Sequence, residues 1–130
     1  MKQLAIRENH LYRKAYNRGI KASRGSVCIY VLKDRHAHII QKANPKKVKM
    51  NRVGISASKK IGGAVARNRA KRVVREAYRL LEAQFCLKKG WLVVIVCRKE
   101  ATVLKMQDVK RDMQFCLEKT GLLVDADSRK

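Results

Sequence analysis

Residues 59–79 read KKIGGAVARNRAKRVVREAYR, and the spacing within this stretch decides how the chain around it folds. A lysine pair and two glycines precede aliphatic residues at helical intervals, which predicts a helix from Gly63 or Ala64 to Gln84. When that helix is wound at about 100° per residue, its aliphatic residues fill one side. The opposite side, an arc of roughly 140°, carries these residues: Arg67, Asn68, Lys71, Arg72, Arg75 and Arg79, with Arg69 at its border. The sequence therefore predicts an amphipathic helix with an apolar back and a cationic face.

The charge on this helix points to a polyanionic partner. Cations four residues apart repel one another, and Glu76 is the only acidic residue on the cationic half before Glu82. A phosphate backbone lying along the helix would offset that repulsion. Lys59 and Lys60, beside backbone N–H groups at the helix start, add an anion-binding loop. A merely solvated basic face is the less favoured alternative.

The composition of the whole chain agrees with such a partner. The 130 residues carry a formal net charge of +22, which favours nucleic acid, with an anionic membrane surface as the competitor. A hydrophobic fraction of 46% favours a folded chain, and we expect a single domain over residues 1–130 with flexible ends at 1–7 and 122–130. The sequence shows neither a long apolar run nor a secretory signal, which favours no membrane partner and a cytoplasmic location.

The rest of the chain alternates between helical and strand patterns. Helices are predicted at residues 9–19, with Asn9 as the N-cap, and at about 104–121. Strands are predicted at 26–33, 52–58 and 91–98, the last covered on both faces. In the basic connection 34–51, Ile39 and Ile40 could extend a hairpin, and NPKK at 44–47 should be a turn. Gly54, inside a strand, indicates a close approach to the backbone. The order predicts a small α+β or α/β sandwich.

Catalytic and metal-binding patterns are weak in this sequence. The cysteines at positions 28, 86, 97 and 116 form no C-x-x-C pair, which favours buried free thiols over a zinc site or disulfides. His36 and His38 lack a neighbouring cysteine or carboxylate cluster, so a solvated segment is favoured over a metal site. There is no Walker pattern, and no nucleophile has an evident His and carboxylate partner. The residues alone therefore predict an RNA- or DNA-binding module.

Tyr12 and Tyr16 in the first helix admit two readings. Their helical spacing with Leu11 and Ala15 favours core packing. Their nearness to basic residues leaves a second possibility, that they stack on unpaired bases.

The segment RVGISASKKIGGAVARNRAKRVVREAYR, residues 52–79, resembles the signature region of the protein subunit of bacterial ribonuclease P, with its RNR motif at residues 67–69. The resemblance extends back through LYRKAYNRG and VCIYVL and forward through WLVVIVCRKEA to the last helix. It implies an α+β fold: an αβββαβα two-layer sandwich resembling ribosomal protein S5 domain 2, with a left-handed crossover through the RNR helix, against the usual hand.

The resemblance also implies a division of labour. A partner RNA, which holds Mg²⁺, would remove the 5′ leader of precursor tRNA, and the protein would contribute no catalytic residue. The protein would bind the catalytic RNA and the leader, the latter in a cleft between the first helix and the sheet. The implied leader-binding residues are Tyr12, Tyr16, Tyr30 and Lys60. The implied RNA-binding residues are Lys59, Arg67, Asn68, Arg69, Lys71, Arg72 and Arg75.

The chain departs from the family pattern in the long basic connection at 34–51, where Lys46, Lys47 and Lys49 could add RNA contacts. Three functional classes compete: an RNA-dependent endonuclease subunit, a ribosomal or assembly protein that only binds RNA, and a DNA-compacting protein. Charge alone does not separate them, because any polyanion that binds a basic protein releases counterions, whatever the function of the complex. The RNR helix after SKKIGG favours the first.

Overall fold

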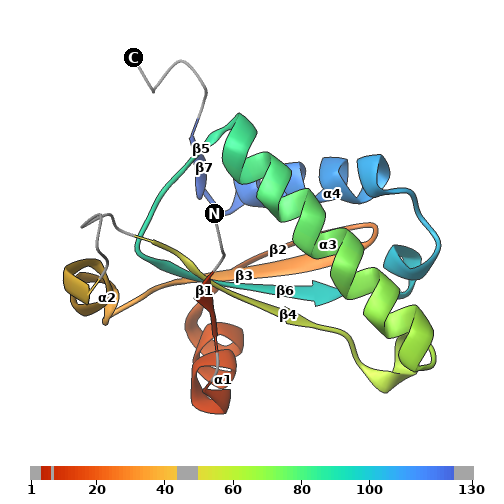
Figure 1. Cartoon of the computed structure of the whole chain (residues 1–130), viewed down its shortest axis with the longest axis horizontal. Helices are drawn as coiled ribbons and strands as arrows, with labels where there is room; N and C mark the ends of the chain where they lie inside the picture. The colour runs from red at the N-terminus through yellow and green to blue at the C-terminus, as the bar shows by residue number, and fades with distance from the viewer. Residues whose placement is uncertain (1–3, 7, 44–49, 125–130) are drawn as a thin grey trace.

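A mixed five-stranded sheet organises the chain, whose computed structural model describes residues 4–6, 8–43 and 50–124 (Figure 1). The strand order is β1-β4-β6-β3-β2, and a separate two-stranded sheet pairs β5 with β7. The strands are β1 (Leu4–Ala5), β2 (Ile20–Arg24), β3 (Val27–Lys33), β4 (Arg52–Ser56), β5 (Cys86–Leu87), β6 (Trp91–Cys97) and β7 (Leu123–Val124). The helices are α1 (Asn9–Arg18), α2 (Ala37–Ala43), α3 (Ala64–Gln84) and α4 (Met106–Lys119), with 3₁₀ turns η1 (Lys59–Ile61) and η2 (Lys99–Thr102).

The predicted αβββαβα order is confirmed by α1, β2, β3, β4, α3, β6 and α4. β4 and β6 are parallel neighbours, and α3 forms the crossover that joins them. β6 also pairs antiparallel with β3 along its full length, so it is the central strand of the sheet. Its side chains from Leu92 to Ile95 are at most 2% exposed, which confirms the strand predicted to be covered on both faces.

Helices lie on both faces of the sheet (Figure 1). α3 and α4 cover one face, and their buried side chains form the main core with alternate residues of β3, β4 and β6. α1 lies across the opposite face, where Leu11 and Ala15 pack on Leu92 and Val94. The sheet with α3 and α4 makes the two predicted layers, and α1 adds a partial third.

The connection after β3 differs from the predicted hairpin, because Ile39 and Ile40 lie in helix α2. The Asp34 carboxylate accepts a hydrogen bond from the His36 N–H at 3.0 Å, and the Asp34 carbonyl accepts one from the Ala37 N–H at 3.2 Å. This local turn reverses the chain at the end of β3 and leads directly into α2. The expected NPKK turn and the cations Lys46, Lys47 and Lys49 lie outside the described residues.

Parts of the two terminal segments, 1–7 and 122–130, make contacts with the rest of the fold. β1 pairs with β4, and the Ile6 N–H extends this pairing to the Val53 carbonyl at 3.2 Å. At the other end, Leu122 is 2% exposed, and β7 pairs with β5. Apolar burial and strand pairing therefore hold both segments. The N-cap prediction is also corrected, because Asn9 is the first helical residue and Glu8 precedes it.

A buried ion pair joins the end of β3 to the start of β4. The Asp34 carboxylate, in a residue only 4% exposed, accepts hydrogen bonds from Arg52 Nε at 2.7 Å and Nη2 at 2.9 Å. Arg52 also reaches the exposed Glu8 carboxylate at 3.4 Å. Burial alone would raise the pKa of Asp34, but the hydrogen bonds from Arg52 and His36 outweigh it and lower that pKa. The pair fixes both ends of the connection that contains α2.

Candidate nucleic-acid interface

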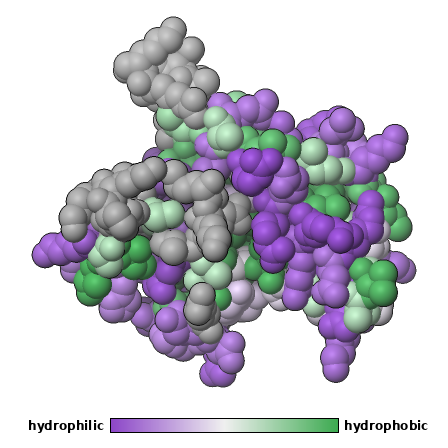
Figure 2. Space-filling model, viewed as in Figure 1, coloured by the Kyte–Doolittle hydropathy of each residue, from purple (hydrophilic) through white to green (hydrophobic). Residues whose placement is uncertain are grey.

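The polar side of α3 forms a cationic face on the surface of the protein. Its buried residues, Ala70, Val74, Ala77, Tyr78 and Leu81, pack toward the sheet and α4, which confirms the predicted apolar back. We define the cationic face as Arg67, Asn68, Lys71, Arg72 and Arg75, which are exposed or half-buried. Figure 2 shows hydrophilic side chains gathered over α3 on the side turned to the viewer.

The remaining cations of this helix have partners within the protein. The Arg79 guanidinium pairs with the Glu76 carboxylate, with Nη2 and Oε1 2.5 Å apart on the exposed surface. Among the described residues, no ion pair includes a member of the cationic face. Lys59 and Lys60 lie exposed on η1, the turn that leads from β4 toward α3. On this part of the chain, the cations without an ion pair among the described residues therefore lie on η1 and on α3 as far as Arg75.

Arg69, the last residue of the RNR motif, points into the protein. Its Nη1 donates to the carbonyls of Thr102 at 2.7 Å and Ala101 at 3.4 Å, and its Nη2 donates to the Leu104 carbonyl at 3.2 Å. These bonds hold η2 against the start of α3. The structure thus separates Arg69, with a positioning role, from the other cations predicted on this helix.

Arg69→Ala should lower the free energy of unfolding by about 1.5–3 kcal/mol, because carbonyls that now share one charged donor would lose it. Arg72→Ala removes the same charge from an exposed position of the same helix and should change stability by less than about 0.5 kcal/mol. Urea unfolding at fixed salt measures both variants. Equal losses would show that charge, and not the contact with η2, determines the effect.

The three predicted cleft tyrosines come together on the α1 side of the sheet. The rings of Tyr16 and Tyr30 meet edge to face, with centroids 5.0 Å apart and an interplanar angle of 75°. Tyr12 packs over β4, where a Cβ on Gly54 would come within 2.6 Å of the Tyr12 Cζ atom. The close approach predicted at Gly54 is therefore made by Tyr12. We call Tyr12, Tyr16 and Tyr30 the tyrosine cluster.

The tyrosine cluster is only partly used for packing. Tyr12 and Tyr30 are half-buried against the small core under α1, whereas the Tyr16 side chain is 40% exposed. Burial raises the pKa of the Tyr12 and Tyr30 hydroxyls, so both are neutral near pH 7 and can donate hydrogen bonds. The core packing that the helical spacing favoured is thus found in part for Tyr12, whereas the Tyr16 side chain stays largely outside the core.

Lys21 is a cation beside this cluster that the sequence patterns did not single out. Its Nζ lies 5.8 Å from the centroid of the Tyr30 ring. Lys21 and Tyr30 are direct cross-strand partners in the β2–β3 register, so a prediction of β2 with its register would have found the pair. Lys60 lies past the end of β4, the strand under Tyr12.

The described residues offer no site for protein-borne metal chemistry. No group of three or more His, Cys, Asp or Glu side chains in residues 4–6, 8–43 and 50–124 could hold a metal ion. Cys28, Cys97 and Cys116 are buried, and Cys86 is half-buried. Burial raises the pKa of the Cys97 and Cys116 thiols to about 11, so both are protonated and weakly nucleophilic near neutral pH. Within the described ranges, no helix is long and apolar enough to cross a membrane.

A cationic helix face and a partly exposed tyrosine cluster together define a nucleic-acid-binding protein. Residues 1–121 match the family model described as ribonuclease P. The ribonuclease P protein component of Dehalococcoides mccartyi is 39% identical over 90 residues, which are 69% of this chain and 72% of that protein. The corresponding protein of Clostridium botulinum is 33% identical over 122 residues, 94% of this chain and 98% of that one. The chain therefore belongs to the ribonuclease P protein family.

A solved structure supports the same fold. The ribonuclease P protein of Staphylococcus aureus superposes with a TM-score of 0.71 at 21% identity, covering 95% of this chain and all of that one. Family membership decides among the three functional classes in favour of the RNA-dependent endonuclease subunit. The chain acts as a protein component of the ribonucleoprotein that processes the 5′ ends of tRNA together with an RNA subunit.

Proposed function

We propose that the tyrosine cluster binds the 5′ leader of precursor tRNA, while the cationic face and η1 bind mainly the catalytic RNA. The observation that carries the first assignment is the Tyr16–Tyr30 pair, in which an exposed ring stands beside a second ring and the Lys21 ammonium. Unpaired bases stack on such rings, while nearby cations pair with the phosphates between them. Lys60 on η1 adds a further cation for the leader.

The second assignment rests on cations that form no ion pair among the residues that the structure describes. Arg67, Lys71 and Arg75 are separated by single helical turns, so they form a row along α3. An RNA backbone presents phosphates in a row, and binding them releases condensed counterions. Asn68 and Arg72 flank this row, and Lys59 extends the contact onto η1.

The proposal also accounts for the role of Mg²⁺. As the family resemblance implies, we assign Mg²⁺ to the partner RNA. Cations on α3 neutralise part of the phosphate repulsion when the RNA subunit and precursor tRNA meet. The complex should therefore cleave at a lower Mg²⁺ concentration than the RNA subunit alone, and the isolated protein should cleave nothing. Precursor tRNA is made in the cytoplasm of a bacterial cell, which is the expected location.

Tyr16→Ala should weaken binding of leader-bearing precursor tRNA by about 1–3 kcal/mol, the contribution of one stacked base. Mature tRNA should bind unchanged, because it has no leader. Equilibrium binding of both tRNAs to the reconstituted complex, in Ca²⁺ to prevent cleavage, measures the difference.

Tyr16→Phe is the matched control, since it keeps the ring and should keep most of the precursor affinity. The salt dependence of binding should stay nearly the same in both variants, because neither removes a charge. Unchanged precursor affinity for Tyr16→Ala, together with a lower melting temperature, would assign Tyr16 to packing alone.

A further inference from the structure

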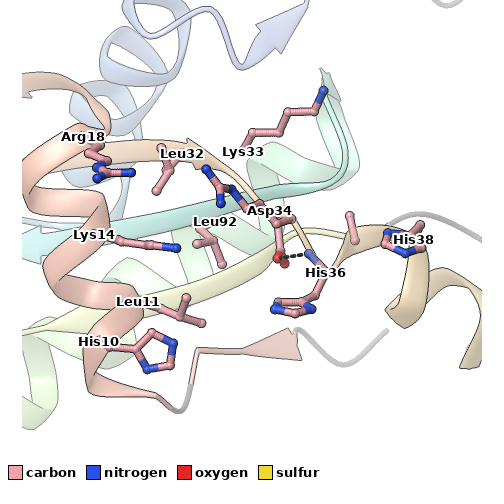
Figure 3. A pocket seen from close by; sticks show the side chains of 12 residues that line it. His10, Leu11, Lys14, Arg18, Leu32, Lys33, Asp34, His36, His38 and Leu92 are labelled. Carbon is pink, nitrogen blue, oxygen red and sulfur yellow. Dashed lines mark hydrogen bonds between the residues drawn. The ribbon is translucent and has the colours of Figure 1, made fainter.

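A second basic site lies on the other flank of α1, in a pocket of about 610 Å³ (Figure 3). One wall is α1, and the other is the end of β3 with the turn that leads into α2. Leu11, Leu32 and Leu92 form an apolar floor, and Leu11 and Leu92 are buried. The pocket has the size of a small-molecule site. We call it the α1–α2 pocket.

Three cations surround this floor: Lys14, Arg18 and Arg35. Lys33 lines the edge of the pocket, but it is the direct partner of Trp91, whose side chain packs on the α3 and α4 side of the sheet, so the Lys33 side chain faces away from α1. Figure 3 shows Lys14 and Arg18 extending from α1, across the pocket from Asp34 and His36. Among the described residues, none of these three cations takes part in an ion pair. Lys14 is half-buried and Arg18 and Arg35 are exposed, so these like charges repel one another across a solvent-accessible pocket.

The single carboxylate of the pocket does not neutralise these cations. Asp34 already accepts hydrogen bonds from Arg52 at 2.7 and 2.9 Å and from the His36 N–H at 3.0 Å. Arg52 balances its charge from the β4 side. The pocket therefore keeps an excess of three formal positive charges, those of Lys14, Arg18 and Arg35. His10, His36 and His38, which also line it, add imidazole N–H donors.

The geometry of α1 separates this pocket from the tyrosine cluster. Leu11 and Ala15 pack on the sheet, so the two flanks of the helix face opposite directions along the surface. Tyr16 lies roughly 160° around the helix from Lys14. One flank thus presents aromatic rings, and the other presents His10, Lys14 and Arg18 at intervals of one turn.

We propose that the α1–α2 pocket binds a phosphodiester group of an RNA strand, as an RNA contact additional to the tyrosine cluster and the cationic face. Clustered guanidinium, ammonium and imidazole donors are suited to phosphate oxygens. The inference rests on the RNA-binding role of the chain and is independent of leader recognition by the tyrosines. The bound strand belongs either to the catalytic RNA or to precursor tRNA, and the experiment separates these sources.

The test uses the double variant Lys14→Ala with Arg35→Ala, which removes one cation from each wall of the pocket. Its charge-matched control is Arg111→Ala with Lys119→Ala on α4, which lies on the opposite face of the sheet (Figure 1). The protein is titrated with the catalytic RNA alone at several salt concentrations. The reconstituted complex, at saturating protein, is then titrated with precursor and with mature tRNA.

In one of the two titrations, the pocket variant should lower the slope of log affinity against log salt by about 0.7–0.9, or one phosphate contact. A lower slope with the catalytic RNA alone identifies that RNA as the source, and one only in the tRNA titration identifies tRNA. The ratio of precursor to mature affinity should stay within about twofold if the strand lies outside the leader. Slopes equal to wild type, or changed equally by the α4 control, would overturn the proposal. If the tyrosine cluster does not bind the leader, the wild-type complex itself will bind precursor and mature tRNA equally. That result is distinct from an unchanged salt slope in the pocket variant, so the two proposals can fail separately.

Discussion

Asp34→Ala should lower the free energy of unfolding by about 3–5 kcal/mol, because it leaves the Arg52 guanidinium as a buried charge without its main partner. The Arg52 side chain is 12% exposed and the Asp34 side chain 1%, so water replaces little of the lost interaction. The two residues also hold the ends of the connection that contains α2. Chemical unfolding at pH 7 and fixed salt measures the loss; fixed salt matters because a net charge of +22 opposes compaction.

Two further variants separate the ion pair from simple charge removal. Glu8→Ala removes the exposed arm of the network at 3.4 Å and should cost less than about 1 kcal/mol. Asp34→Ala combined with Arg52→Met should recover part of the loss, because no unpaired charge stays buried. A single-variant loss below about 1 kcal/mol would contradict a buried, coupled pair.

The pH dependence of this loss has a definite sign. The pKa of Asp34 is lowered in the folded protein, so the carboxylate contributes stability above its unfolded pKa of about 4. That contribution is lost as the pH falls through the lower, folded pKa. The difference in stability between wild type and Asp34→Ala should thus be constant near neutral pH and shrink below about pH 4.

A triple variant of the cationic face, Arg67→Ala with Arg72→Ala and Arg75→Ala, should flatten the salt dependence of binding to the catalytic RNA. Each lost phosphate contact lowers the slope of log affinity against log salt by about 0.7–0.9, so three lower it by about 2.1–2.7. Between 50 and 200 mM salt, wild type should therefore lose about 20- to 40-fold more affinity than the variant. Filter binding over this range measures both.

The control for charge alone is Lys88→Ala with Arg111→Ala and Lys119→Ala, which removes the same charge outside α3. Its slope should fall less, because Lys88 lies outside α4, so the three positions form no single row, and Arg111 already pairs with the Asp108 carboxylate at 3.8 Å. Equal slopes for the two triple variants would mean that the protein attracts RNA through its net charge and that α3 has no special part.

The periodicity of apolar residues in the sequence predicted most of the fold. It did so where burial against the sheet or a helix determines which positions are apolar, as in α3 and β6. α3 has a cationic face and an apolar back, and its predicted limits match the structure. β6 is apolar throughout because helices cover both of its faces. β2 has no such pattern: it lies at the sheet edge with only Ala22 buried, so its pairing with β3 comes from the β2–β3 turn and the partner strand. α2 has no buried residue, which explains why burial-based spacing missed it.

Residue types also indicated the candidate sites, but tertiary contacts assigned their roles. Helical winding placed Arg69 at the border of the cationic face, yet its guanidinium donates to the carbonyls of Thr102 in η2 and of Leu104 just after it, more than thirty positions along the chain. Helical spacing could not decide whether Tyr16 packs or stays exposed, because the answer depends on where α1 ends relative to the sheet. The α1–α2 pocket is formed from segments that no local pattern connects. Such roles depend on pairs distant in sequence, which periodicity does not encode.

Leader selectivity tests the central claim most directly. The complex of this protein with its RNA subunit is titrated with precursor tRNA that carries a 5′ leader and with the matching mature tRNA, in Ca²⁺ at one salt concentration. One or more bases stacked on the tyrosine cluster predict at least about fivefold tighter binding of the precursor. This preference should be reduced by Tyr16→Ala and absent for the RNA subunit alone. Equal affinities of the wild-type complex for the two tRNAs would contradict the account.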